Sequence, residues 1–187
     1  MNDIVRVGFI LCIITVLSGF AISGVYEITK EPIAIQKEKA QQEAMETVLK
    51  GVDHFELVNQ NDAEIKQGVL EIHTGYQKDQ IIGYVMKVVT RGYGGNMELM
   101  VGIDQGGVIQ GVKILGHSET PGLGANAQEP EFLDQYKGKS TEQPLSVIKG
   151  QATGEAEIEA ITSATITAEA VTSAINEARS VFKEQLN

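Results

Sequence analysis

The chain has 187 residues and a formal net charge of −10 at pH 7. This length suits one domain with a short appendage, and an acidic chain without a basic stripe is a poor partner for nucleic acid, because phosphate repels it. The single cysteine, Cys12, excludes an intrachain disulfide, a Cys/His zinc site and a cysteine-bound iron–sulfur cluster within the chain.

An uncharged apolar segment runs from Val7 to Tyr26 and reads VGFILCIITVLSGFAISGVY. About 20 such residues form a helix that crosses a hydrocarbon layer roughly 30 Å thick, so we predict that residues 7–26 span a lipid bilayer and that residues 1–26 form a membrane anchor. A cleaved signal peptide is the alternative, although its apolar region is usually only about 7 to 15 residues long. The Lys and Arg counts leave the orientation open, because long domains cross membranes largely regardless of charge.

The next segment, residues 27–50, is rich in Ala, Gln, Glu and Lys. Pro32 suits the first turn of a helix, and Gly51 suits a position just after its end. Apolar residues recur at roughly helical spacing between them. We therefore predict an amphipathic connecting helix here, with a solvated coil as the alternative.

Residues 68–115 change to a strand-like pattern. β-Branched and apolar residues fill 81–90, and polar or glycine-containing turns at 77–80 and 104–107 separate the apolar runs. Residues 116–150 are broken by Pro and Gly. Val171, Ile175, Ala178 and Phe182 then follow the spacing of one helical face, in a C-terminal helix that ends near Leu186. The pattern predicts an α+β domain at 51–187, an antiparallel sheet with flanking helices, preceded by one N-terminal transmembrane helix.

Metal ligands do not cluster in the sequence. The three histidines, His54, His73 and His117, lie far apart and none has a second histidine three or four residues away, so structural or solvated roles are favoured over a metal site. Two glycine-rich loops, at 92–95 and 119–124, each follow a predicted strand. Such loops are either tight turns or places where the backbone approaches a ligand closely.

The segment ITSATITAEAV at 161–171 gathers hydroxyl side chains at the start of the C-terminal helix. The free N–H groups at a helix N-terminus favour a phosphate, and the hydroxyls of Thr162, Ser163, Thr165 and Thr167 could bind it too. A threonine oxygen can also be esterified to a phosphate. The simpler alternative is that Thr167 or Ser163 only caps the helix.

The sequence ITSATIT at 161–167 resembles the [ST]GATxT flavinylation motif of FMN-binding domains in two proteins, the G subunit of the Rnf electron-transport complex and the C subunit of the sodium-pumping quinone reductase. In that motif the threonine after the alanine carries FMN through a phosphoester bond, installed by a flavin transferase that uses FAD. Thr165 matches it here. GYGGNMELMVGID at 92–104, GVKILGHSETPGLGANA at 111–127 and EPEFLDQYKGKS at 129–140 also resemble the Rnf G subunit, so the likeness covers nearly the whole chain.

The chain departs from the family pattern at two positions. Ser163 replaces the usual glycine, and serine tolerates a positive φ less well. Glu159 replaces the usual aspartate and keeps its charge on a longer side chain. These departures leave noncovalent FMN open as an alternative to attachment at Thr165.

The resemblance implies an FMN site without catalytic or metal-binding residues. Leu123 is expected to offer an apolar face to the flavin ring, and Thr120 hydrogen bonds. The full set of residues expected to bind FMN is Tyr93, Gly94, Glu119, Thr120, Gly122, Leu123, Thr162, Ser163, Ala164, Thr165 and Thr167.

The resemblance also implies a function. We expect a single-pass flavoprotein subunit of an Rnf-type ferredoxin:NAD+ oxidoreductase, with its FMN domain on the extracytoplasmic side of a bacterial cytoplasmic membrane. It would relay electrons among other Rnf subunits, coupled in the complex to Na+ or H+ transport, and would need a flavin transferase for maturation. Two alternatives stay open: a membrane-tethered binding or assembly module without redox chemistry, and an FMN carrier of the quinone reductase or of extracellular electron transfer.

Overall fold

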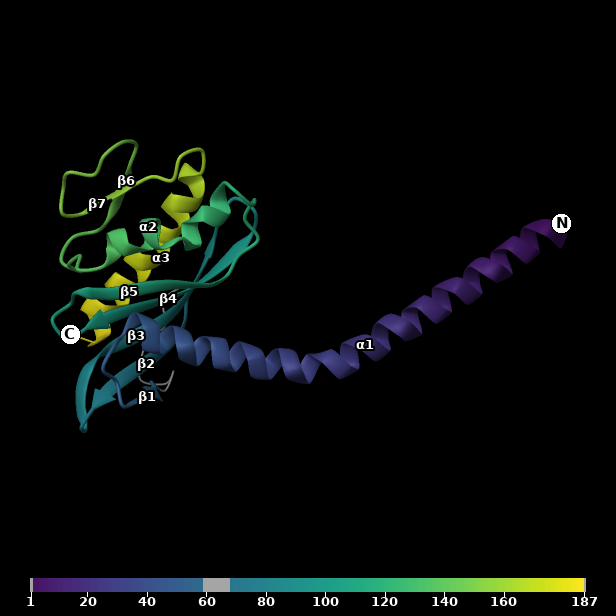
Figure 1. The fold of residues 1–187 in the computed structure, drawn as a ribbon, viewed down its shortest axis with the longest axis horizontal. Helices are drawn as coiled ribbons and strands as arrows, with labels where there is room; N and C mark the ends of the chain where they lie inside the picture. Colours follow the sequence, from purple (N-terminus) through teal and green to yellow (C-terminus); the bar gives the residue numbers. More distant parts are fainter. Residues whose placement is uncertain (1, 59–67, 187) are drawn as a thin grey trace. The chain divides into compact units, whose positions relative to one another are not determined.

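The computed structural model describes residues 2–58 and 68–186 of the chain (Figure 1). The chain divides into two compact units, residues 1–41 and 42–187. The sequence places domain boundaries at 26/27 and 50/51, and those boundaries stay predictions.

The N-terminal unit lies within helix α1 (Asn2–Val48). Among the described residues this is the one helix that is long and apolar enough, by length and composition, to cross a membrane. None of its most apolar window is buried by protein, and large side chains such as Phe9 and Phe20 are exposed. A lipid-facing helix has this surface, because hydrocarbon solvates it.

Residues 27–48 continue α1, where we expected a separate connecting helix. Pro32 lies inside the helix. Proline has no backbone N–H, so it removes one hydrogen bond to the preceding turn, but it does not end the helix here. The last residues of α1, from Gln42 to Val48, belong to the C-terminal unit.

An antiparallel sheet of five strands forms the centre of the C-terminal unit, and the antiparallel α+β prediction is confirmed (Figure 1). Its strands pair in chain order: β1 (His54–Leu57), β2 (Val69–Gln77), β3 (Gln80–Arg91), β4 (Asn96–Asp104) and β5 (Ile109–Gly116). The turn between β2 and β3 has Lys78 and Asp79 at φ of 48° and 63°. Two positive φ values match the right-handed twist of the strands they join.

Helix α3 (Thr165–Val181) packs against β3 and β4 and continues into a π-helical turn, Phe182–Leu186. Val171, Ile175, Ala178 and Phe182 are each at most 1% exposed, so the helical face expected from their spacing is the buried one. They share the main core with alternate residues of the sheet, such as Leu99.

The end of α1 packs in a second, smaller core. Its buried residues are Ala44, Met45, Val48, Leu49, Val85 and Met100. Gly102 of β4 pairs with Gly111 of β5, and together they let the backbone of Val48 come close. A Cβ atom on Gly102 would overlap the Val48 carbonyl, and one on Gly111 would lie 3.1 Å from Val48 Cα.

The segment between β5 and α3 contains more regular structure than the sequence indicated. It forms η1 (Gly124–Gln128), α2 (Pro130–Leu133), η2 (Asp134–Tyr136) and a parallel pair of strands, β6 (Ser146–Ile148) and β7 (Glu157–Glu159). The carboxylate of Glu157 accepts the N–H groups of Thr153 and Gly154 at 3.0 and 2.9 Å. These hydrogen bonds lower the pKa of Glu157.

Candidate functional site

A pocket of about 480 Å³ lies where the loops after β3 and β5 meet the start of α3. Its walls come from three distant parts of the sequence. The lining residues are Tyr93, Glu119, Thr120, Leu123, Gly124, Ser163, Ala164, Thr165, Ile166 and Thr167.

The N-terminus of α3 opens into this pocket without a side-chain cap. Ala164 is the N-cap residue, and no side chain caps the helix. Thr167 bonds elsewhere and Ser163 is exposed, so the alternative that either residue only caps the helix is wrong. The N–H groups of the first turn therefore face a pocket where an anion can accept hydrogen bonds from them. Thr165 is the first residue of α3 and its side chain is half-buried.

Ser163 has a left-handed backbone with φ of 64°. Ser163 thus lies in a turn between Thr162 and Ala164, directly before α3 begins. A Cβ atom makes this conformation costly, which explains why glycine is usual here in the motif that the sequence resembles.

Glu119 is a buried carboxylate in the wall of the pocket, 6% exposed. Its Oε1 accepts the N–H of Gly94 at 2.8 Å, and its Oε2 accepts the hydroxyl of Thr167 at 2.7 Å. Its own N–H donates to Nδ1 of His117 at 3.2 Å. Glu119 therefore joins the loop after β3, the loop after β5 and the first turn of α3.

Glycines allow the backbone to close around this carboxylate. A Cβ atom on Gly92 would overlap Oε1 of Glu119, and one on Gly124 would overlap Oε2 and lie 2.7 Å from Oγ1 of Thr167. Neither glycine has a left-handed φ, so close packing alone explains the lack of a side chain there.

The pocket also gathers exposed apolar side chains. In the described residues beyond α1, the exposed large apolar side chains are Leu57, Leu70, Tyr93, Leu123 and Ile166. Three of these five line the pocket: Tyr93, Leu123 and Ile166 are 74%, 43% and 55% exposed. A flat apolar ring with an attached phosphate fits such a site, because the ring covers these side chains while the phosphate meets the start of α3.

Eight of the eleven residues expected at the FMN site line this pocket. Gly94 instead donates its N–H to Glu119. Gly122 has a φ of 77° and accepts a hydrogen bond from Asn126. Thr162 faces a neighbouring groove, which it shares with Glu159. The roles of all eleven residues in binding FMN stay predictions.

Sequence reasoning missed two lining residues, Gly124 and Ile166. Gly124 ends the glycine-rich loop that was singled out. Ile166 is the variable position inside the ITSATIT segment, and the sequence signal that could have found it is a large apolar residue between two threonines.

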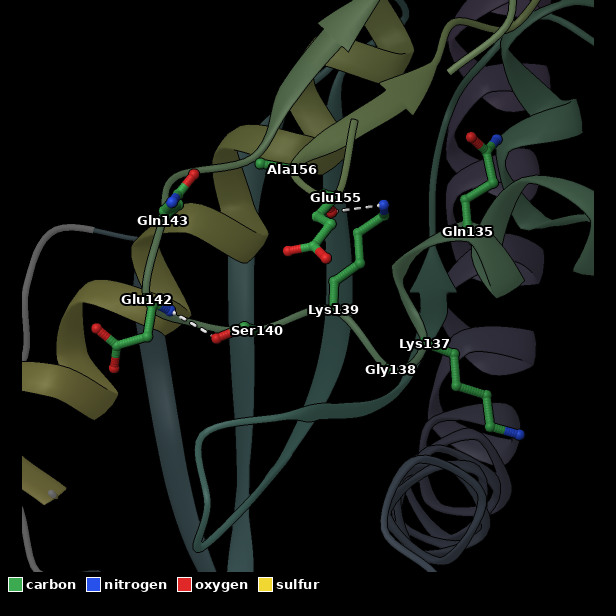
Figure 2. Close-up of a pocket in the computed structure, with 9 residues that line it drawn as sticks. All are labelled: Gln135, Lys137, Gly138, Lys139, Ser140, Glu142, Gln143, Glu155 and Ala156. Atoms are coloured by element: carbon green, nitrogen blue, oxygen red, sulfur yellow. Dashed lines mark hydrogen bonds between the residues drawn. The ribbon is translucent and has the colours of Figure 1, made fainter. Parts of the chain in front are cut away.

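A second pocket, of about 500 Å³, lies on the loop between η2 and β6 (Figure 2). Its polar side chains largely serve the fold. Lys139 Nζ donates to the Glu155 carbonyl at 2.8 Å, and Ser140 Oγ accepts the N–H of Glu142 at 3.1 Å. None of the residues expected at the FMN site lines this pocket.

Comparison with known proteins identifies the family. A family model described as the FMN-binding domain matches residues 92–180, and one described as the RnfG N-terminal region matches residues 1–48. A relative from Clostridium ljungdahlii, named as the G subunit of a proton-translocating ferredoxin:NAD(+) oxidoreductase complex, is 35% identical over 95% of this chain and 90% of its own length. The chain belongs to the RnfG family.

Another RnfG relative comes from Acetobacterium woodii. It is named as the G subunit of a Na(+)-translocating ferredoxin:NAD(+) oxidoreductase complex and is 34% identical over 95% of this chain and 91% of its own length. Among solved structures, the C subunit of the Na(+)-translocating NADH-quinone reductase from Parabacteroides distasonis matches with a TM-score of 0.63 at 19% identity, over 83% of this chain and 96% of that one. This RnfG chain and that quinone reductase protein share a fold.

Proposed function

We propose that this RnfG-family chain is the membrane-anchored FMN-carrying subunit of an Rnf-type ferredoxin:NAD+ oxidoreductase complex, with FMN attached covalently to Thr165. The FMN-binding-domain match covers the pocket and the start of α3. The relatives that match over 95% of the chain are named as G subunits of such complexes.

One observation carries the assignment of the site. The uncapped first turn of α3 and three exposed apolar side chains line the same pocket. The first feature favours a phosphate and the second favours a ring, and FMN contains both.

In this proposal the residues of the chain hold the FMN in position. The first turn of α3 and the hydroxyl of Ser163 would bind the phosphate, and Tyr93, Leu123 and Ile166 would cover the ring. Bound FMN supplies one- and two-electron redox chemistry. A phosphoester between Thr165 Oγ1 and the FMN phosphate, formed from FAD with AMP as the leaving group, would make the protein heavier by FMN less one water.

The proposed neighbours are the other membrane subunits of the complex, and a flavin transferase for maturation. We place the FMN domain on the extracytoplasmic side of the membrane, as the resemblance implies. Either H+ or Na+ could be the coupling ion, because the relatives named for each ion are almost equally similar to this chain.

In-gel fluorescence tests the attachment. The full chain is co-expressed with a flavin transferase, and a denaturing gel is viewed under ultraviolet light. We expect a fluorescent band that is lost in Thr165→Ala and kept in Ser173→Ala, which removes an exposed hydroxyl of α3 outside the proposed FMN site. Fluorescence that persists in Thr165→Ala would remove this residue from the proposal.

The same preparation separates the alternatives. A colourless wild-type protein after co-expression would favour the binding or assembly module. A coloured protein that purifies with quinone reductase subunits, or with no membrane partner at all, would favour the other FMN carriers.

A further inference from the structure

We propose that Glu119 lowers the reduction potential of the flavin, because its carboxylate places a buried negative charge in the wall of the FMN pocket. The inference rests on the proposed function and adds a role for one residue of the same site. Glu119 is a positioning and tuning residue in this proposal.

The carboxylate of Glu119 is held in place by its surroundings. Both oxygens accept hydrogen bonds, one from Gly94 N–H and one from the hydroxyl of Thr167. The neighbouring His117 presents Nδ1 to the backbone N–H of Glu119 at 3.2 Å, so that nitrogen acts as an acceptor there.

No cationic side chain neutralises this charge in the described part of the chain. The ion pairs with N···O within 4.0 Å involve other glutamates, such as Glu71 and Glu142. Buried carboxylates usually have a cationic partner, and this one has two neutral donors instead. Its charge is therefore compensated only in part.

An uncompensated charge in this position opposes reduction. Each electron that enters the pocket adds one negative charge unless a proton enters with it. A buried carboxylate in the wall of the pocket repels that charge. The partial positive charge at the start of α3 acts in the opposite direction.

The packing fixes the distance from Glu119 to the pocket. Gly92 and Gly124 lie against its carboxylate, so closely that a Cβ on either would overlap it. The group has no room to turn away when the charge in the pocket changes. Its field is thus a fixed property of the site.

The variant Glu119→Gln removes the charge and keeps the hydrogen bonds. Glutamine Oε1 can accept from Gly94 N–H, and Nε2 can donate to Oγ1 of Thr167, because a hydroxyl both donates and accepts. Glu169→Gln is the matched control. It makes the same change in net charge on an exposed residue of α3, where water and salt screen it.

A spectroelectrochemical titration of the full chain, solubilised in detergent with FMN attached, tests the proposal. We expect a higher midpoint potential in Glu119→Gln than in the wild type, with a much smaller change in Glu169→Gln. The difference should persist in concentrated salt. Equal potentials in the wild type and Glu119→Gln, at equal flavin content, would overturn the proposal.

A second variant keeps the test decisive if Glu119→Gln does not fold. Glu119→Met removes the charge and has a side chain of similar length, so the midpoint potential should rise as it does in Glu119→Gln. An unchanged or lowered potential in Glu119→Met, at equal flavin content, would overturn the inference. A wild-type protein that carries no flavin would instead contradict the proposed function itself.

Discussion

Thr167 and Glu119, 48 residues apart in the sequence, share a buried hydrogen bond of 2.7 Å between Oγ1 and Oε2. The bond joins the first turn of α3 to the loop after β5. Both segments line the pocket, so the bond holds the phosphate end and the ring end of the proposed FMN site together.

Thr167→Val should destabilise the domain. Valine keeps the shape of threonine but donates no hydrogen bond, so a buried carboxylate oxygen loses its donor. Hydrogen bonds to charged groups contribute about 1.5–3 kcal/mol, and we expect a decrease of this size in the free energy of unfolding. Denaturant unfolding of the apoprotein measures it. Thr162→Val, at an exposed residue, should change stability by less than about 0.5 kcal/mol; equal losses in the two variants would contradict the role of the bond.

Ser163→Gly should stabilise the domain. Ser163 has a φ of 64°, and a left-handed backbone costs a residue with a side chain about 1–2 kcal/mol. Glycine loses more conformational entropy on folding, which costs about 0.5–1 kcal/mol, so a net gain of up to about 1.5 kcal/mol remains. Ser173→Gly, the same change in the middle of α3, should destabilise by about 0.5 kcal/mol. Thermal unfolding should show a gain in stability for Ser163→Gly and a loss for Ser173→Gly. A loss of stability in both variants would contradict the backbone strain at Ser163.

Gly102→Ala should loosen the contact between the sheet and the end of α1. Its methyl group would overlap the carbonyl of Val48, which is rigid backbone, so the helix end must shift. Overpacking of this kind costs about 1–3 kcal/mol. Hydrogen exchange at residues 42–49 should rise in this variant. Gly116→Ala, with no atom within 4 Å of the new Cβ, should leave both stability and exchange unchanged; slow exchange in Gly102→Ala would show that the contact tolerates a side chain.

Glu177 makes stability depend on pH. Burial raises its pKa, and Oε2 has no hydrogen-bond partner in the described residues. A carboxyl group whose pKa is raised by folding is protonated in acid, where its burial costs little. As the pH rises above the ordinary pKa of the group, the folded state loses stability, because burial disfavours the charged form. Glu177→Gln should therefore be more stable than the wild type at pH 7, and the advantage should shrink toward pH 4. Melting curves across that range check this, and an advantage that grows in acid would contradict the sign.

The sequence was a good guide to the fold where patterns are local. The apolar run at 7–26, the turns at 77–80 and 104–107 and the helical spacing from Val171 to Phe182 each depend on neighbouring residues. The parallel pairing of β6 with β7 could not be predicted, because strands of three residues carry almost no periodicity. The continuation of α1 through Pro32 was missed because the remaining hydrogen bonds of a long helix outweigh the one that proline removes.

The site was harder to predict than the fold. The resemblance indicated which loops meet, but not which atoms. The bond between Thr167 and Glu119 depends on the packing of two glycines around a carboxylate, and nothing in the spacing of these residues indicates it. The absence of a cap on α3 was likewise visible only in the structure, because the segment offers several hydroxyls and uses none of them as a cap.

Mass analysis of the protein from its native membrane tests the central claim most directly. The intact chain and the peptide that contains Thr165 are measured after denaturation, which removes noncovalent ligands. The account predicts an added mass of FMN less one water, located on Thr165. An unmodified peptide at this position in a fully matured complex would contradict it.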